Sequence, residues 1–153
     1  MYFLTYFSKV SKSIKSEDVA DILKKAQVKN RKNNLTGLLL FRSRTFFQLL
    51  EGEKKDVLAT FKKISVDPRH HEIKILFETE ISDASRIFPS WSMGQISEQM
   101  ADADQEALMR SLRSIATSVG GGREKVIDLL RKFSTASPSS ATGIMARVRT
   151  KKK

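Results

Sequence analysis

Two short apolar segments, TGLLLF at residues 36–41 and TFFQLLE at 45–51, are separated only by the polar sequence Arg-Ser-Arg. Both segments have the composition of strands, and so short a polar connection predicts a hairpin. Their apolar residues occupy consecutive rather than alternate positions, which is typical of a sheet covered on both faces. The rest of the chain must therefore supply helices for two faces of one sheet.

Two amphipathic segments flank this hairpin. The first helix is predicted to begin at Ser16, which would cap it, with Glu17 and Asp18 complementing the helix dipole in the first turn. The second helix takes residues 54–65. Both carry apolar residues at the spacing of a helix that packs on a sheet. These residues are Val19, Ile22, Leu23 and Ala26 in the first helix and Val57, Phe61 and Ile64 in the second.

The remaining strands complete a known plan. A first strand is predicted at 2–7, a longer one at 72–81 after a DPRHH turn, and a short last one at 91–96. The order is β-α-β-β-α-β with one extra strand, which predicts an α+β, ferredoxin-like sheet. Two C-terminal helices are predicted, at 103–118 with Asp102 as cap and at 123–133. We expect the first two helices on one face of the sheet and the C-terminal pair on the other.

The composition narrows the class of protein. The chain has 153 residues, 40% of them hydrophobic, which suits one globular body, and the absence of cysteine excludes disulfides and thiolate metal sites. The start MYFLTYF lacks the features of a secretory signal, and no segment approaches the length of a membrane span. We expect a cytoplasmic protein with no membrane partner and no bound metal.

The net charge of +11 raises the question of a nucleic-acid partner. Residues 144–153 hold several of the basic side chains and no acid, and they follow the Ser-, Thr- and Pro-rich sequence STASPSSATG. Such a sequence has nothing to bury, so a flexible basic tail is predicted at 134–153. We interpret the charge as this tail plus a solvated surface, and we do not expect nucleic-acid binding.

Polar side chains at inward positions indicate a site. In the predicted strands Gln48 shares a face with Phe46 and Leu50, and Tyr6 shares one with its neighbours at every second position. If the first and third strands are neighbours, as in a ferredoxin-like sheet, Tyr6 and Gln48 can meet. Asn30 should emerge on the inner face near the end of the first helix. Together they describe a mostly apolar pocket with a few fixed polar groups.

Each of these residues also has an ordinary explanation. Tyr6 could keep its hydroxyl on the rim of the core, Gln48 could bond a neighbouring backbone group, and Asn30 could be a helix C-cap. Trp91 and Met93, which share a face of the last strand, could belong to the core. It is their convergence that favours a site.

The motifs in their order and spacing resemble the BLUF domain, the blue-light sensor that uses flavin. The resemblance covers residues 1–96, and we expect the domain to end there, followed by a helical extension at 97–133. It rests on TYFSK at 5–9, Asn30, NLTGLLL at 34–40, FFQLLEGE at 46–53, the IxxDxRH spacing at 64–70 and FPSWSMG at 88–94.

The resemblance implies a non-covalently bound flavin, normally FAD, with FMN or riboflavin as variants. The family's flavin-contacting tyrosine, glutamine and asparagine fall on Tyr6, Gln48 and Asn30. The remaining implied flavin contacts are Ile22, Lys63, Ile64 and Met93. Signal transmission would fall on Trp91 and Met93 in the last strand.

The implied function is light sensing without catalysis. Tyr6 would lose an electron and a proton to excited flavin and regain both, and Gln48 would rearrange its hydrogen bonds. We expect the signal to reach a downstream protein or a homo-oligomer through the C-terminal helices, without a fused catalytic domain. The alternatives are a ferredoxin-like RNA-binding module, which would need exposed strand aromatics, and a metabolite-binding regulatory module. A hydrolase using His70 and His71 lacks suitable partners, so these histidines are interpreted as surface or structural residues.

Overall fold

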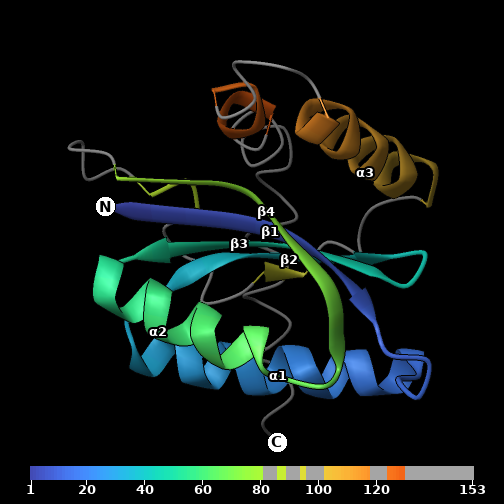
Figure 1. The fold of residues 1–153 in the computed structure, drawn as a ribbon, viewed down its shortest axis with the longest axis horizontal. Coiled ribbons are helices and arrows are strands. Elements are labelled where there is room, and N and C mark those ends of the chain that lie inside the picture. The colour runs from blue at the N-terminus through green and yellow to red at the C-terminus, as the bar shows by residue number, and fades with distance from the viewer. Residues whose placement is uncertain (81–85, 89–93, 96–101, 118–123, 130–153) are drawn as a thin grey trace, which may run out of the picture.

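The fold was analysed in a computed structural model, which describes residues 1–80, 86–88, 94–95, 102–117 and 124–129 (Figure 1). The strands are β1 (Tyr2–Val10), β2 (Thr36–Arg42), β3 (Thr45–Gly52), β4 (His70–Glu80) and β5 (Gly94–Gln95). The helices are α1 (Ser16–Lys32), α2 (Lys54–Ser65) and α3 (Asp102–Thr117), and residues 124–129 are also helical. No helix in these ranges is long and apolar enough to cross a membrane.

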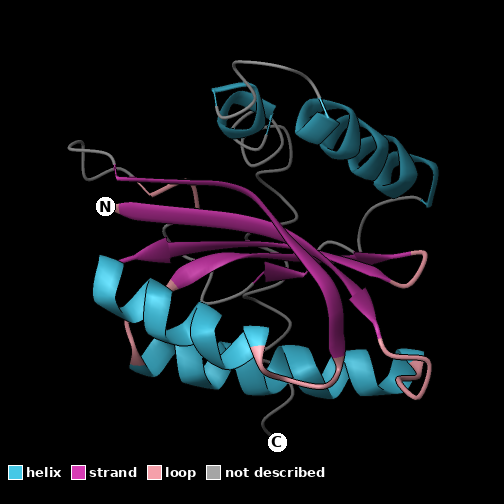
Figure 2. Cartoon of the chain, viewed as in Figure 1, coloured by secondary structure: helices cyan, strands magenta, loops and turns pink. Residues whose placement is uncertain are grey.

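The five strands form one sheet in the order β4-β1-β3-β2-β5. The first four are antiparallel to their neighbours and β5 lies parallel to β2, so the predicted ferredoxin-like α+β plan is confirmed. Figure 2 shows three layers, with α1 and α2 on one face and α3 and the helical turn of residues 124–129 on the other. β1 and β3 are adjacent at the centre, which is the condition for Tyr6 and Gln48 to meet.

The two-residue loop between β2 and β3 has the backbone conformation that so short a hairpin turn requires. Ser43 and Arg44 both have positive φ, 49° and 58°, as in the two-residue turns whose twist matches that of antiparallel strands. Along the hairpin, Gly37 lies so close to β3 that a Cβ there would be 1.9 Å from the Leu49 carbonyl oxygen. The hairpin therefore holds β2 tightly against the strand that carries Gln48.

The two faces of the sheet bury separate apolar clusters. The cluster under α1 and α2 includes Leu4, Tyr6, Phe46, Leu50 and Val57, whereas the cluster under α3 includes Phe3, Phe47, Leu49, Leu108 and Leu112. The alternation of neighbouring residues between the two sets follows from the period of two along a strand. Covering both faces explains why Phe46, Phe47, Leu49 and Leu50 are all apolar.

Several boundaries differ from the sequence prediction. The N-cap of α1 is Lys15 rather than Ser16, because the Asp18 carboxylate accepts a hydrogen bond from the Lys15 backbone N–H at 2.7 Å. β4 begins at His70, so both histidines belong to the strand and the turn is confined to residues before them. Asp102 is the first residue of α3 rather than its cap.

Of the remaining predicted elements, one strand is longer than predicted, one helix has the predicted bounds, and some residues cannot be compared. β1 continues to Val10, where the Val10 N–H donates to the Arg44 carbonyl oxygen at 2.9 Å. The second helix has the predicted bounds. Trp91, Met93 and the predicted tail at 134–153 lie outside the described residues.

Candidate functional site

Tyr6 and Gln48 form a buried pair at the centre of the sheet. The register of β1 on β3 places them directly opposite one another, on the face covered by α1 and α2. Tyr6 has no exposed surface and Gln48 is 5% exposed. The Tyr6 hydroxyl donates a hydrogen bond to Gln48 Oε1. The meeting of these two side chains, which the sequence allowed, is present in the structure.

The surroundings of Tyr6 keep its phenol neutral. Burial raises the pKa of Tyr6 far above its usual value, and the negative charge of Asp67 adds to the rise. The Tyr6 ring packs against Phe61 of α2, with ring centroids 5.3 Å apart. A phenolate is therefore strongly disfavoured, and the phenol acts as a hydrogen-bond donor over the ordinary range of pH.

Asn30 lies in the last turn of α1 and is 2% exposed. Its backbone oxygen accepts a hydrogen bond from the Leu35 N–H at 2.8 Å, so its main chain helps to end the helix. Its side-chain Nδ2 is buried and has no hydrogen-bond partner among the residues that the structure describes. Buried amide donors are nearly always satisfied in native proteins. The Asn30 amide therefore points to a ligand with an acceptor at this position.

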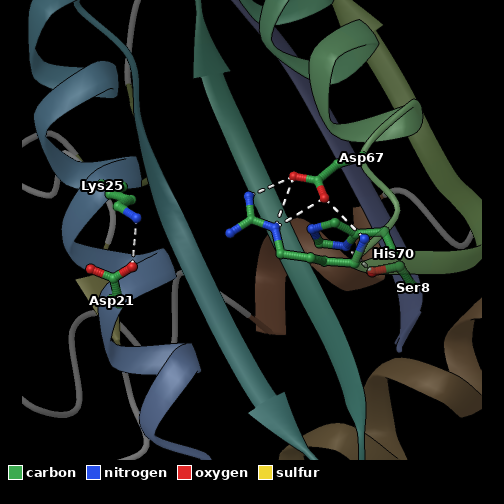
Figure 3. A network of polar contacts seen from close by, with 6 residues as sticks. Ser8, Asp21, Lys25, Asp67 and His70 are labelled. Carbon is green, nitrogen blue, oxygen red and sulfur yellow. Dashed lines mark hydrogen bonds and ion pairs between the residues drawn. The ribbon is translucent and has the colours of Figure 1, made fainter. Parts of the chain in front are cut away.

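A network of four polar side chains lies beside Tyr6, and the ring centroids of His70 and Tyr6 are 6.5 Å apart. The network comes from β1, β4 and the turn after α2, and consists of Ser8, Asp67, Arg69 and His70 (Figure 3). Asp67 forms an ion pair with Arg69, whose Nε lies 3.0 Å from both carboxylate oxygens. The hydrogen bonds from Arg69 lower the pKa of Asp67 to about 2. His70 shares a hydrogen bond of 2.8 Å with Ser8, and burial lowers the pKa of His70. Sequence reasoning did not assign this network, although IxxDxRH marks its position.

The two histidines differ in burial. His70 is half-buried and packs on Phe46, with ring centroids 5.2 Å apart, whereas His71 is exposed. No group of three or more His, Cys, Asp or Glu side chains in the described ranges is placed to hold a metal ion. These contacts give His70 a packing role near Tyr6.

The structure gathers some of the other predicted contacts around the same face. Ile22 of α1 and Ile64 of α2 are partly buried and pack against the cluster that contains Tyr6. Lys63 is exposed on α2. Met93 and Trp91 fall outside the described residues. The described part of the candidate site thus spans β1, β3 and the inner sides of two helices.

One buried charge lies on the opposite face. Glu51 of β3 has no exposed surface, and it was part of the motif FFQLLEGE without an assigned role. Burial raises its pKa, an effect that hydrogen bonds from Ile87, Phe88 and Thr36 oppose. An acidic residue that interrupts an apolar strand was the available sequence signal. Its partners, which lie 15 to 37 residues away, were not predictable from it.

The fold and the site define a ferredoxin-like domain with a candidate ligand site on the face covered by α1 and α2. Comparison with known proteins identifies the family: residues 1–94 match the model of the BLUF family, described as sensors of blue light using FAD. The chain belongs to the BLUF family. BLUF domains bind flavin, and the unsatisfied buried donor of Asn30 fits a group whose ring carries acceptor atoms.

Similar proteins include both long and short chains. The photoactivated adenylate cyclase subunit beta of Euglena gracilis is 31% identical over 98 residues, which cover 63% of this chain and 11% of that protein. The blue light- and temperature-regulated antirepressor BluF of Escherichia coli (strain K12) is 34% identical over 70 residues, or 46% of this chain and 17% of the antirepressor. The chain thus spans a small fraction of these relatives.

The likeness to one solved structure extends over most of both chains. The dark-state structure of the BLUF protein BlrB has a TM-score of 0.70 and 31% sequence identity, covering 88% of this chain and 96% of that one. The shared fold therefore includes more than the 94 residues that match the family model.

Proposed function

We propose that this chain senses blue light through a flavin, normally FAD, held between α1 and α2 against the Tyr6–Gln48 pair. The observation that carries the proposal is the buried hydrogen bond between Tyr6 and Gln48, on the same face as the unsatisfied Asn30 amide. An apolar face with a few fixed polar groups is the usual form of a cofactor site.

The residues proposed to hold the flavin include polar, apolar and charged side chains, which would make different contacts. Asn30 would donate to the pyrimidine edge of the ring, and Gln48 would contact the ring on the sheet side. Ile22 and Ile64 would flank the ring with apolar surface, and both are partly buried in the cluster that contains Tyr6. Lys63, which is exposed, would contact the flavin at the outer edge of the site. Met93 is proposed as a contact from the family resemblance alone.

The bound flavin supplies absorption of blue light and an excited state that accepts an electron. In the proposed cycle, Tyr6 would give an electron and its phenolic proton to the flavin and would later regain both. Loss of the proton before the electron is disfavoured, because burial and the Asp67 charge strongly disfavour the phenolate that it would leave.

Gln48 is the proposed switch. A primary amide carries an acceptor on one prong and donors on the other, and the two prongs have nearly the same shape. Turning or tautomerising this amide would exchange its hydrogen-bond pattern without repacking the surrounding core. The altered donation to the flavin would shift the absorption to the red.

The proposed signal route crosses the sheet. Gln48 is opposite Leu39 of β2, and Leu39 is paired with Gln95 of β5. The change would reach β5, and Trp91 and Met93, which come shortly before β5 in the sequence, are proposed from the family resemblance to pass it to the C-terminal helices. We propose a downstream signalling protein or a second copy of the chain as the receiver. The relatives named as cyclase subunits and as an antirepressor support a sensor that serves different outputs.

Absorption spectroscopy of the purified chain tests this function. Flavin-loaded protein should be yellow, with a spectrum that shifts reversibly to the red under blue light and recovers in the dark. Gln48→Leu and Tyr6→Phe should bind flavin and lose the reversible shift. Tyr2→Phe is the matched control, because Tyr2 lies on the same strand and bonds Glu78 at 2.7 Å instead.

The outcomes separate the function from its mechanism. Colourless protein that FAD cannot reconstitute would refute light sensing and leave a metabolite-binding module as the alternative. A complete reversible shift in Gln48→Leu would show that the switch is wrongly assigned, although the chain would still sense light.

A further inference from the structure

The Glu51 carboxylate fastens a segment far away in the chain to the sheet. Its Oε2 accepts a hydrogen bond from the Ile87 backbone N–H at 2.8 Å, and its Oε1 accepts one from the Phe88 N–H at 2.7 Å. Oε1 also accepts from the Thr36 hydroxyl at 2.8 Å. Both oxygens are thus committed in a fully buried position, and two of their three donors belong to one short segment, residues 86–88.

Arg86 strengthens the same attachment. Its guanidinium donates to the Thr36 hydroxyl at 2.8 Å and to the Asn34 carbonyl oxygen at 2.8 Å. It also donates to the Glu51 carbonyl oxygen at 3.3 Å. Residues 86–88 are therefore fastened by both main chain and side chain to the start of β2 and the end of β3. The side chains of Ile87 and Phe88 enter the apolar cluster under α3.

This attachment lies directly before the strand on the proposed signal route. Only residues 89–93 separate Phe88 from Gly94, where β5 begins. In the described residues β5 is held to β2 by two register pairs, Leu38 with Gly94 and Leu39 with Gln95. So short a ladder contributes little by itself, and the nearest described attachment before it in the sequence is the one between Glu51 and residues 86–88.

We propose that Glu51 is a positioning residue that holds residues 86–88, and through them β5, in the dark arrangement, and that light weakens this hold. The inference rests on the proposed function and adds a regulatory restraint on the face opposite the flavin. Gln48 and Glu51 belong to one strand but face opposite sides, so the flavin-side switch and the restraint are separable by substitution.

Glu51→Gln tests the restraint with little change of shape. The amide nitrogen cannot accept, so whichever oxygen is replaced, Ile87 or Phe88 loses its acceptor. Amide exchange is measured at these two residues in flavin-loaded full-length protein, in the dark and under blue light. In the wild type, light should accelerate exchange by about tenfold or more. In Glu51→Gln the dark rate should rise to the lit level, leaving a light-to-dark ratio below about twofold.

The red shift of the flavin should keep its wild-type amplitude in Glu51→Gln, because Tyr6 and Gln48 are untouched. Glu53→Gln is the matched control: Glu53 is exposed and makes no side-chain cap to α2, so its light-to-dark ratio should equal that of the wild type. A purely structural Glu51 would speed exchange equally in dark and light.

Three results would overturn the inference. They are a wild-type light-to-dark ratio in Glu51→Gln, loss of its red shift, and equal acceleration in both states. If the wild type itself shows no red shift, the proposed function fails and the inference falls with it. If Glu51→Gln does not fold, Thr36→Val decides, since it removes the hydroxyl between Arg86 and Glu51. Thr36→Val should lower the light-to-dark ratio of amide exchange by less than is expected for Glu51→Gln. A ratio equal to that of the wild type refutes the inference.

Discussion

The two faces of the sheet treat buried polar groups in opposite ways. Under α3 the Glu51 carboxylate accepts three hydrogen bonds from protein donors, so both of its oxygens are bonded within the described part of the chain. Under α1 and α2 the Asn30 amide nitrogen is buried with no partner in the described part of the chain, although the Tyr6 hydroxyl nearby is paired with Gln48. Hydrophobic packing is present on both faces, so it does not distinguish them.

The difference has opposite consequences for the stability of the flavin-free protein. A carboxylate buried at a satisfied site stabilises only the arrangement that supplies its donors, because any other arrangement leaves a charge unpaired. An amide buried without a partner costs stability until a ligand arrives. In the described residues, the buried carboxylate on one face is satisfied by the protein itself, whereas the face proposed to bind flavin keeps a buried donor without a partner.

The largest effect is expected from Glu51→Ala. Truncation leaves the Ile87 and Phe88 N–H groups and the Thr36 hydroxyl without their acceptor. The free energy of unfolding should fall by about 3 kcal/mol, even though relief from burying the charge offsets part of the loss. Urea denaturation measures this, with Glu53→Ala as an exposed control that should change stability by less than about 0.5 kcal/mol. Equal effects for both variants would remove the contrast between the faces.

The next largest effect is expected from Asn30→Leu, which should leave the flavin-free protein at least as stable and should weaken flavin binding. Asn30→Leu keeps similar volume and removes the unsatisfied donor, so the flavin-free protein should be unchanged or more stable by about 1 kcal/mol. Flavin affinity should fall about tenfold, equivalent to about 1.4 kcal/mol. Thermal unfolding without flavin and fluorescence titration with FAD measure the two quantities.

The control for this variant is Asn33→Leu, because Asn33 is the exposed C-cap of the same helix. It should leave flavin affinity unchanged. If Asn30→Leu destabilises the flavin-free protein by more than about 1 kcal/mol, the amide is satisfied within the protein and the faces are alike.

The sequence predicted the sheet and the meeting of Tyr6 with Gln48 for a physical reason. Strand period, helix period and strand order are local or topological properties, and they were enough to predict that Tyr6 and Gln48 could meet, whereas the register that sets them opposite one another came from the structure. The restraint at Glu51 was not predicted, because its donors are backbone N–H groups of residues 87 and 88, which any residue except proline possesses. Likewise the Lys15 cap depends on which of several polar residues the Asp18 carboxylate reaches.

A smaller effect is expected from Asp67→Asn, beside the face proposed to bind flavin. Asparagine keeps the acceptor for the Arg69 backbone N–H, 2.9 Å from Oδ1, and removes the charge. The folded pKa of Asp67, about 2, lies below the unfolded value, so its stabilisation is present above about pH 4 and disappears as the pH falls towards 2. Because the Arg69 side chain is 40% exposed, the loss at pH 7 should be only about 1 kcal/mol.

Unfolding free energies measured from pH 7 down to pH 3 check this prediction. The difference between wild type and Asp67→Asn should narrow continuously over the acid part of the range. A constant difference would mean that Asp67 contributes through its shape and hydrogen bonds rather than through its charge.

The smallest effect is expected at the ion pair across from Asp67, between Lys25 and Asp21 of α1 (Figure 3). Its Nζ–Oδ2 distance is 2.7 Å and the hydrogen bond from Lys25 lowers the pKa of Asp21, yet the two side chains are 64% and 58% exposed. Water and salt screen such a pair almost completely, so Lys25→Ala should leave the unfolding midpoint unchanged at low and at high salt. A midpoint that falls at low salt only would show that the electrostatic field on the exposed side of α1 is stronger than the exposure of these side chains implies. In that case the contrast between the faces would include long-range charge as well as hydrogen bonding.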